Sequence, residues 1–221
     1  MMQIRNELAS MRYRSNGTWK CPLVIRVPVG GYIHGAICHS QSIDGYFMHM
    51  PGIRIAYPSN ASDAKGLLKA ACRMDDPVIF MEHKRLYMTK CEVPDDLKPI
   101  PLGKGRVRKS GEDITIVAIQ RMNLFAEEAA RKLETESIRC EIIDPRTYSP
   151  LDEELIFSSV KKTGRVIVVD ESNPKCSLAS EITSLISEKC FYDLKGPIAK
   201  ITAPHTPVSY THLTLPTNRE V

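Results

Sequence analysis

Short apolar runs alternate with segments of helical periodicity along almost the whole chain. The clearest helical segment spans residues 59–73 and begins at Ser59 or Asn60, either of which can cap a helix. Its apolar residues recur at helical spacing and share one face: Ala64, Leu67, Leu68 and Ala71. The apolar run PVIFMEH follows at residues 77–83. This alternation is typical of parallel sheets covered by helices, so we expect an α/β fold.

The alternation falls into two units. They are separated by the proline- and glycine-rich segment VPDDLKPIPLGKG at residues 93–105, which we predict to be a linker. In the first unit we expect helices at residues 7–15, 42–50 and 59–73 and strands at 22–28, 54–58 and 77–83. In the second unit we expect strands at 114–119, 140–144, 165–171 and 198–202 and helices at 152–162 and 177–189. We also expect a helix on which Ala126, Ala129, Ala130 and Leu133 share one face. The second unit has the complete pattern of a doubly wound sheet.

Charge and cysteine content exclude several classes of function. The chain carries 30 Lys and Arg against 26 Asp and Glu, a net charge of +4. Neither sign forms a long block, so nucleic acid and anionic membranes are poor partners. The seven cysteines are scattered without a CxxC pair, which indicates a reducing compartment rather than disulfides or a zinc site. No apolar run is long enough to span a membrane and no signal-peptide core is seen, so we expect a cytoplasmic protein.

Several short segments together carry a family resemblance: HSQ (residues 39–41), PSNASDAKGLL (58–68), DPRTYSPLD (144–152), DESNPKCSLASEI (170–182) and APHTPV (203–208). On these residues the chain resembles the beta subunit of the thiamine-dependent decarboxylase component of 2-oxo acid dehydrogenase complexes. The resemblance covers residues 2–207. It implies that residues 1–92 are the latter part of a transketolase-like pyrimidine-binding domain and that residues 106–207 are a doubly wound transketolase C-terminal domain.

The resemblance also implies an activity and partners. These are the oxidative decarboxylation of pyruvate or a branched-chain 2-oxo acid and acyl transfer to a lipoyl group, in an alpha2-beta2 assembly with a beta-beta contact. Thiamine diphosphate and magnesium would be shared with the alpha subunit, and the product would pass to a lipoyl acyltransferase core. Two alternatives stay open. One is a non-catalytic assembly subunit that docks the acyltransferase core, and the other is a relative of transketolase or deoxyxylulose-phosphate synthase.

His39 is the candidate catalytic residue, because it matches the histidine of the family's HSQ segment. An imidazole changes its charge near neutral pH, so it can give a proton to a developing alkoxide or to a dithiolane sulfur. We expect Ser40, Gln41 and Ser42 to cap the following helix and hold the ring. The other histidines of the first unit do not lie in a segment that matches the family. His34 lies in the glycine-rich loop before HSQ, and we expect His49 and His83 at the surface or at an element boundary.

Some relatives also hold a potassium ion with backbone carbonyls. The positions that match them are Leu23, Ala71, Cys72, Met74 and Asp76. Carbonyl ligands leave little trace in the side chains, so an ordinary helix end closed by Asp75, Asp76 and Pro77 is the alternative interpretation.

The two ends of the chain differ from the family pattern. Beta subunits of this kind carry an upstream segment whose glutamate binds the aminopyrimidine ring of the cofactor, and this sequence does not contain it. At the other end, residues 208–217 read in frame as the translation of a sequencing-library adaptor. We therefore expect residues 208–221 to be an adaptor-derived tail without a packed element, and the chain as written to be an inactive fragment.

Overall fold

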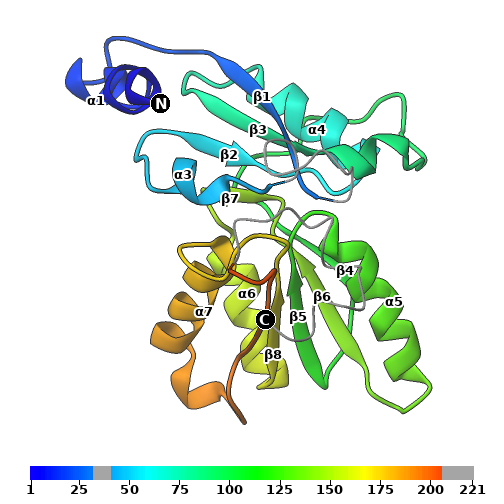
Figure 1. Ribbon diagram of the computed structural model, residues 1–221. Helices are drawn as coiled ribbons and strands as arrows, with labels where there is room; N and C mark the ends of the chain where they lie inside the picture. The colour runs from blue at the N-terminus through cyan, green and yellow to red at the C-terminus, as the bar shows by residue number, and fades with distance from the viewer. Residues whose placement is uncertain (32–40, 206–221) are drawn as a thin grey trace.

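A computed structural model describes residues 1–31 and 41–205. These residues form a four-stranded and a five-stranded sheet, which lie one above the other in Figure 1. Helices pack on both faces of the lower sheet, so the expected α/β class is confirmed. We refer to residues up to 105 as the first half of the chain and to the remainder as the second half. Within the described ranges, no helix is long and apolar enough to cross a membrane.

The upper sheet has the strand order β1-β3-β2-β7. Strands β1 (Val24–Val29), β3 (Val78–His83) and β2 (Arg54–Ala56) are parallel and match the three runs expected to be strands. The fourth strand, β7 (Thr147–Ser149), comes from the second half and pairs with β2 antiparallel. Sequence patterns did not predict it, because its three residues form no apolar run. The first half therefore takes one strand of its sheet from the second.

Helices cover the upper sheet on two sides. Helix α4 (Ala61–Ala71) begins at Asn60, whose side chain accepts the N–H of Asp63 at 2.8 Å, so the expected cap is confirmed. The buried Leu67 of α4 packs in one cluster with Phe80 of β3. A second apolar cluster contains Ile55 of β2. Two further elements contribute to it, namely α3 (Asp44–Met48) and the π-helical turn η1 (Ile4–Leu8). The helix expected over residues 7–15 is in fact split between η1 and the short α1 (Met11–Arg14).

The linker at residues 93–105 contains no helix or strand, and it follows the 3-10 turn η2 (Lys84–Met88). It is nevertheless held against α4. Lys65 Nζ donates to the carbonyl of Pro94 at 2.9 Å, and the N–H of Ile100 donates to the carbonyl of Gly66 at 3.0 Å. The Ile100 side chain lies so close to Gly66 that an added Cβ there would be 2.5 Å from it. The linker therefore packs against α4 of the first half.

The lower sheet has the strand order β4-β6-β5-β8-β9. Four of its strands are parallel and match the predicted runs: β5 (Ile114–Ala118), β6 (Cys140–Asp144), β8 (Val166–Val169) and β9 (Ala199–Ile201). The edge strand β4 (Arg106–Lys109) is antiparallel and was not predicted, because its sequence RVRK is mostly charged.

Three helices wind around the lower sheet. Helix α5 (Met122–Glu134) lies on one side, and α6 (Glu153–Thr163) and α7 (Leu178–Lys189) lie on the other (Figure 1), followed by the 3-10 turn η3 (Phe191–Asp193). The helix expected to carry Ala126, Ala129, Ala130 and Leu133 on one face is α5; of these residues Ala126 and Ala130 are buried, whereas Ala129 is exposed. Asn123 takes part in this face instead, with its amide donating to the carbonyl of Ala118 at 2.9 Å.

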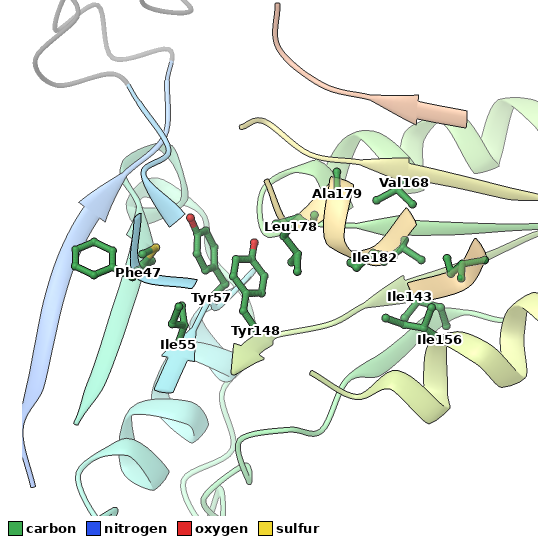
Figure 2. Packing of buried hydrophobic residues seen from close by; sticks show 14 of the residues in the cluster. Phe47, Ile55, Tyr57, Ile143, Tyr148, Ile156, Val168, Leu178, Ala179 and Ile182 are labelled. Atoms are coloured by element: carbon green, nitrogen blue, oxygen red, sulfur yellow. The ribbon is translucent and has the colours of Figure 1, made fainter. Parts of the chain in front are cut away.

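One apolar cluster joins the two halves (Figure 2). Tyr57 lies just after β2, and Tyr148 belongs to β7. Their rings are stacked with centroids 4.5 Å apart. The cluster continues from Phe47 in the first half to Leu178 and Ile182 on α7. The halves therefore share a core at their junction, where the candidate site also lies.

Candidate functional site

The predicted catalytic residue lies outside the described residues. His39 and His34 both belong to segment 32–40, and the expected tail, residues 208–221, is likewise not described. The two ends of segment 32–40 are described, however. The N–H of Gly30, directly after β1, donates to the carbonyl of Gln41 at 3.2 Å. The segment with His39 therefore starts and ends beside the carboxyl end of β1.

The expected capping of the helix after HSQ can be compared with the structure only in part, because Ser40 lies outside the described residues. The N-cap of α3 is Ile43, whose own side chain makes no capping hydrogen bond. The chain instead buries Asp44, the first residue of α3, to 1% exposure.

Glu171 and His83 form a buried pair between the two halves. Glu171 follows β8 and His83 ends β3, and their side chains are 7% and 1% exposed. The Nε2 of His83 lies 2.6 Å from Oε2 of Glu171, and the N–H of Gly31 donates to Oε1 at 2.6 Å. Burial alone would raise the pKa of Glu171, but its hydrogen bond and electrostatic interaction with His83 hold the pKa below its usual value. We had expected His83 at the surface or at an element boundary; it ends β3 but is buried. His49 is exposed, as expected.

Two further aspartates are buried at the same junction. Asp44 is 1% exposed and Asp170 is 5% exposed. The backbone N–H groups of Ser172 and Ala179 donate to Asp170 at 2.9 and 3.3 Å. Burial and the nearby Asp44 raise the pKa of Asp170 to about 7, and burial raises the pKa of Asp44 as well. Since two such carboxylates repel each other, the pair retains a proton near neutral pH.

The segments PSNASDAKGLL and DPRTYSPLD meet in a polar cluster. Arg146 Nη2 is 2.7 Å from Oδ1 of Asp63, whose side chain is 1% exposed. Ser59 donates to Asp144, and Arg108 lies 3.5 Å from the same carboxylate. Burial raises the pKa of Asp144 to about 6. These contacts join the start of α4 to the end of β6.

The positions matched to a potassium site lie around the end of α4. Cys72 is its C-cap, and Met74 and Asp76 follow it. The carbonyl of Leu23 accepts the N–H of Val78 at 2.8 Å, and that of Ala71 accepts the N–H of Met74 at 3.2 Å. Each of these carbonyls keeps a second lone pair, so the arrangement is compatible with a carbonyl site, and potassium stays a prediction.

The carboxylate of Asp76 is occupied by protein partners, because it forms ion pairs with Arg12 at 2.7 Å and Arg54 at 3.0 Å. Across residues 1–31 and 41–205, no group of three His, Cys, Asp or Glu side chains could hold a metal ion. Glu171 likewise does not fit as the carboxylate that binds a cofactor's aminopyrimidine, because Gly31 and His83 already use both of its oxygens.

Comparison with known proteins identifies the family. Residues 1–90 match the transketolase pyrimidine-binding domain, and residues 103–219 match the transketolase C-terminal domain. The chain is 38% identical over its whole length to "Pyruvate dehydrogenase E1 component subunit beta" of Bacillus subtilis, of which it covers 69%. The chain belongs to this family of transketolase-like dehydrogenase beta subunits. The match to the C-terminal domain also includes most of the undescribed residues 208–221.

Other beta subunits of the family are more similar in sequence. The 2-oxoisovalerate dehydrogenase beta subunit of Bacillus subtilis is 47% identical over 93% of the chain, and the chain spans 63% of it. The acetoin:2,6-dichlorophenolindophenol oxidoreductase beta subunit of the same organism is 45% identical over 95% of the chain, which spans 61% of it. A solved structure described as "Split gene transketolase, inactive beta4 tetramer" matches with a TM-score of 0.74 and 27% identity, over 91% of this chain and 61% of that one. The chain thus spans about three fifths of the length of these proteins.

Sequence reasoning missed the buried polar residues of the junction: Asp44, His83, Asp170 and Glu171. A signal for three of them was present. Asp170 and Glu171 end the apolar run RVIVVDE, and His83 ends PVIFMEH. In open α/β sheets, functional groups gather at the carboxyl ends of strands, so polar residues at these positions are candidates. Asp44 gave no such signal, since it lies in a short helix.

Proposed function

We propose that this chain is the beta subunit of a thiamine-diphosphate-dependent 2-oxo acid dehydrogenase, which decarboxylates pyruvate or a branched-chain 2-oxo acid and passes the acyl group to a lipoyl disulfide. The observation that carries the proposal is the 47% identity over 93% of the chain to a 2-oxoisovalerate dehydrogenase beta subunit. The partners are an alpha subunit, which shares thiamine diphosphate and magnesium, a second beta subunit in an alpha2-beta2 assembly, and a lipoyl acyltransferase core. The cytoplasm is the proposed location.

In this proposal, His39 provides the acid of the reaction. When bound, thiamine diphosphate supplies a carbon nucleophile and accepts the electron pair that carbon dioxide leaves behind. His39 gives its proton to the oxygen of the substrate's oxo group or to the lipoyl sulfur that is released as the acyl group binds the other sulfur. Its place is supported by the pairing of Gly30 with Gln41, which brings both ends of segment 32–40 to the carboxyl end of β1.

The test is His39→Ala in the beta subunit assembled with its alpha subunit. Loss of a positioned acid lowers acyl transfer by roughly 10² to 10⁴. His49→Ala is the matched control, because His49 is exposed and its loss should leave the rate unchanged. An assembled His39→Ala enzyme with the wild-type rate would overturn the assignment. An enzyme that assembles on the acyltransferase but shows no turnover in its wild-type form would favour the non-catalytic assembly subunit.

Acetoin is a second candidate substrate, because the acetoin oxidoreductase beta subunit is 45% identical, close to the 47% of the 2-oxoisovalerate enzyme. Sequence identity of this size does not separate the two substrates. The two candidates can be compared by assaying the assembled enzyme with acetoin and with 2-oxo acids, using 2,6-dichlorophenolindophenol as electron acceptor. Faster reduction with acetoin would replace the 2-oxo acid assignment.

A further inference from the structure

Glu171 belongs to the second half of the chain, yet both of its carboxylate oxygens bind the first half. Oε1 accepts the N–H of Gly31, and Oε2 lies against Nε2 of His83, each at 2.6 Å. Gly31 is the last described residue before segment 32–40, which contains His39. Glu171 therefore binds the backbone directly before this segment.

The ring of His83 is held in a single tautomer. Its Nδ1 accepts the N–H of Arg85 at 3.2 Å, so Nδ1 carries no proton and Nε2–H donates to Glu171. Gly30 packs directly on the ring, since an added Cβ would lie 2.3 Å from its atoms, and its φ of +88° is itself unfavourable for other residues. The ring, the glycine turn and the carboxylate are thus in direct contact with one another.

A carboxylate is the side chain that this position requires. Two donors, Gly31 N–H and His83 Nε2–H, face it, and an ionised carboxylate accepts with both oxygens. A glutamine has one accepting oxygen, so its NH₂ group would face one of these donors. His83 could adapt only by moving its proton to Nδ1, where it would meet the N–H of Arg85. Arg121 nearby further favours the charged form of Glu171.

We propose that Glu171 is a positioning residue for His39. Glu171 fixes the backbone at Gly31 and, through His83, the glycine turn that leads into segment 32–40, so that the second half of the chain determines where this segment begins. This inference rests on the proposed role of His39. A shift of about 1 Å in a reacting group can cost about a hundredfold in rate, so a loose start of the segment should be visible in catalysis.

The contact itself can be tested in the full chain without cofactor or partner. NMR of Glu171→Gln should show faster exchange of the Gly31 amide and a changed tautomer at His83, whereas Glu181→Gln, an exposed glutamate on α7, should change neither. Glu171→Asp keeps the charge but is too short for both donors, so it should release one of them even if the glutamine variant does not fold. An unchanged Gly31 amide and His83 ring in both variants would overturn the contact.

The consequence for His39 requires a double-mutant cycle in the assembled enzyme. We expect Glu171→Gln to lower kcat by up to about a hundredfold with little change in KM, and to have no further effect in a His39→Ala background. If the two effects multiply instead, Glu171 does not act through His39 and the positioning role is overturned. If His39→Ala alone has no effect, the proposed function fails, whereas the NMR result still decides whether Glu171 holds Gly31.

Discussion

Single residues differ strongly in how well their sequence context predicts them. His39 could be proposed from its matched frame, because HSQ is a distinctive segment. Glu171 could not, because an acidic residue after an apolar run is common, and its partners Gly31 and His83 lie far away in sequence. Asp44 is similar, since only the packing of α3 against the second half explains its burial.

The buried aspartates predict a pH dependence of stability. Because the folded-state pKa of Asp170 is raised to about 7, the folded state holds more protons than the unfolded state between about pH 4 and 7. Its contribution is therefore fully present below pH 4 and is lost as pH rises through 7. Asp44→Asn removes the nearby charge, so the free energy of unfolding should fall less from pH 5 to 8 than in the wild type. Each pKa unit by which Asp170 moves corresponds to about 1.4 kcal/mol.

Urea unfolding across this pH range measures the effect. Asp193→Asn is the control, because Asp193 is exposed and the same change of charge should leave the pH dependence unaltered. If the free energy of unfolding changes with pH in the same way in Asp44→Asn and in the wild type, Asp44 does not affect the pKa of Asp170.

At the scale of helices and strands, periodicity predicted the elements that carry an apolar face. It placed α4, α6, α7 and the parallel strands within a few residues. It missed β4 and β7, because a charged edge strand and a three-residue strand owe their conformation to a neighbour in space. Periodicity also did not predict the contacts between α4 and β6. Two segments that make these contacts, PSNASDAKGLL and DPRTYSPLD, were nevertheless recognised as motifs in the sequence.

The cluster between α4 and β6 predicts a strong effect of one arginine. Arg146 pairs with the almost fully buried Asp63, so Arg146→Met would leave a buried charge without its partner. Loss of one member of a buried ion pair costs about 3–5 kcal/mol, and we expect the free energy of unfolding to fall by that order. Arg139→Met is the matched control, since Arg139 is 57% exposed and pairs with exposed acids. Equal midpoints in urea for the two variants would contradict the structural role of the cluster.

At the scale of the whole molecule, the shared core predicts that the two halves unfold together. Tyr148 of β7 stacks on Tyr57 and belongs to a cluster that reaches α7. Tyr148→Ala should open a cavity at the junction and lower the free energy of unfolding by about 3–5 kcal/mol. The fluorescence of Trp19, which lies in the first half, and amide exchange in β5 of the second half should report the same loss. Two separate transitions, with only one of them shifted, would show that the halves are independent.

The pairing of β7, from the second half, with β2 of the first half also has a consequence for synthesis on the ribosome. Strand β2 is complete once Ala56 has been made, but its neighbour β7 follows only at Thr147–Ser149. While the residues between them are translated, the edge of β2 has no partner strand and can pair with other chains. The upper sheet of a nascent chain therefore depends on protection until translation has passed Ser149.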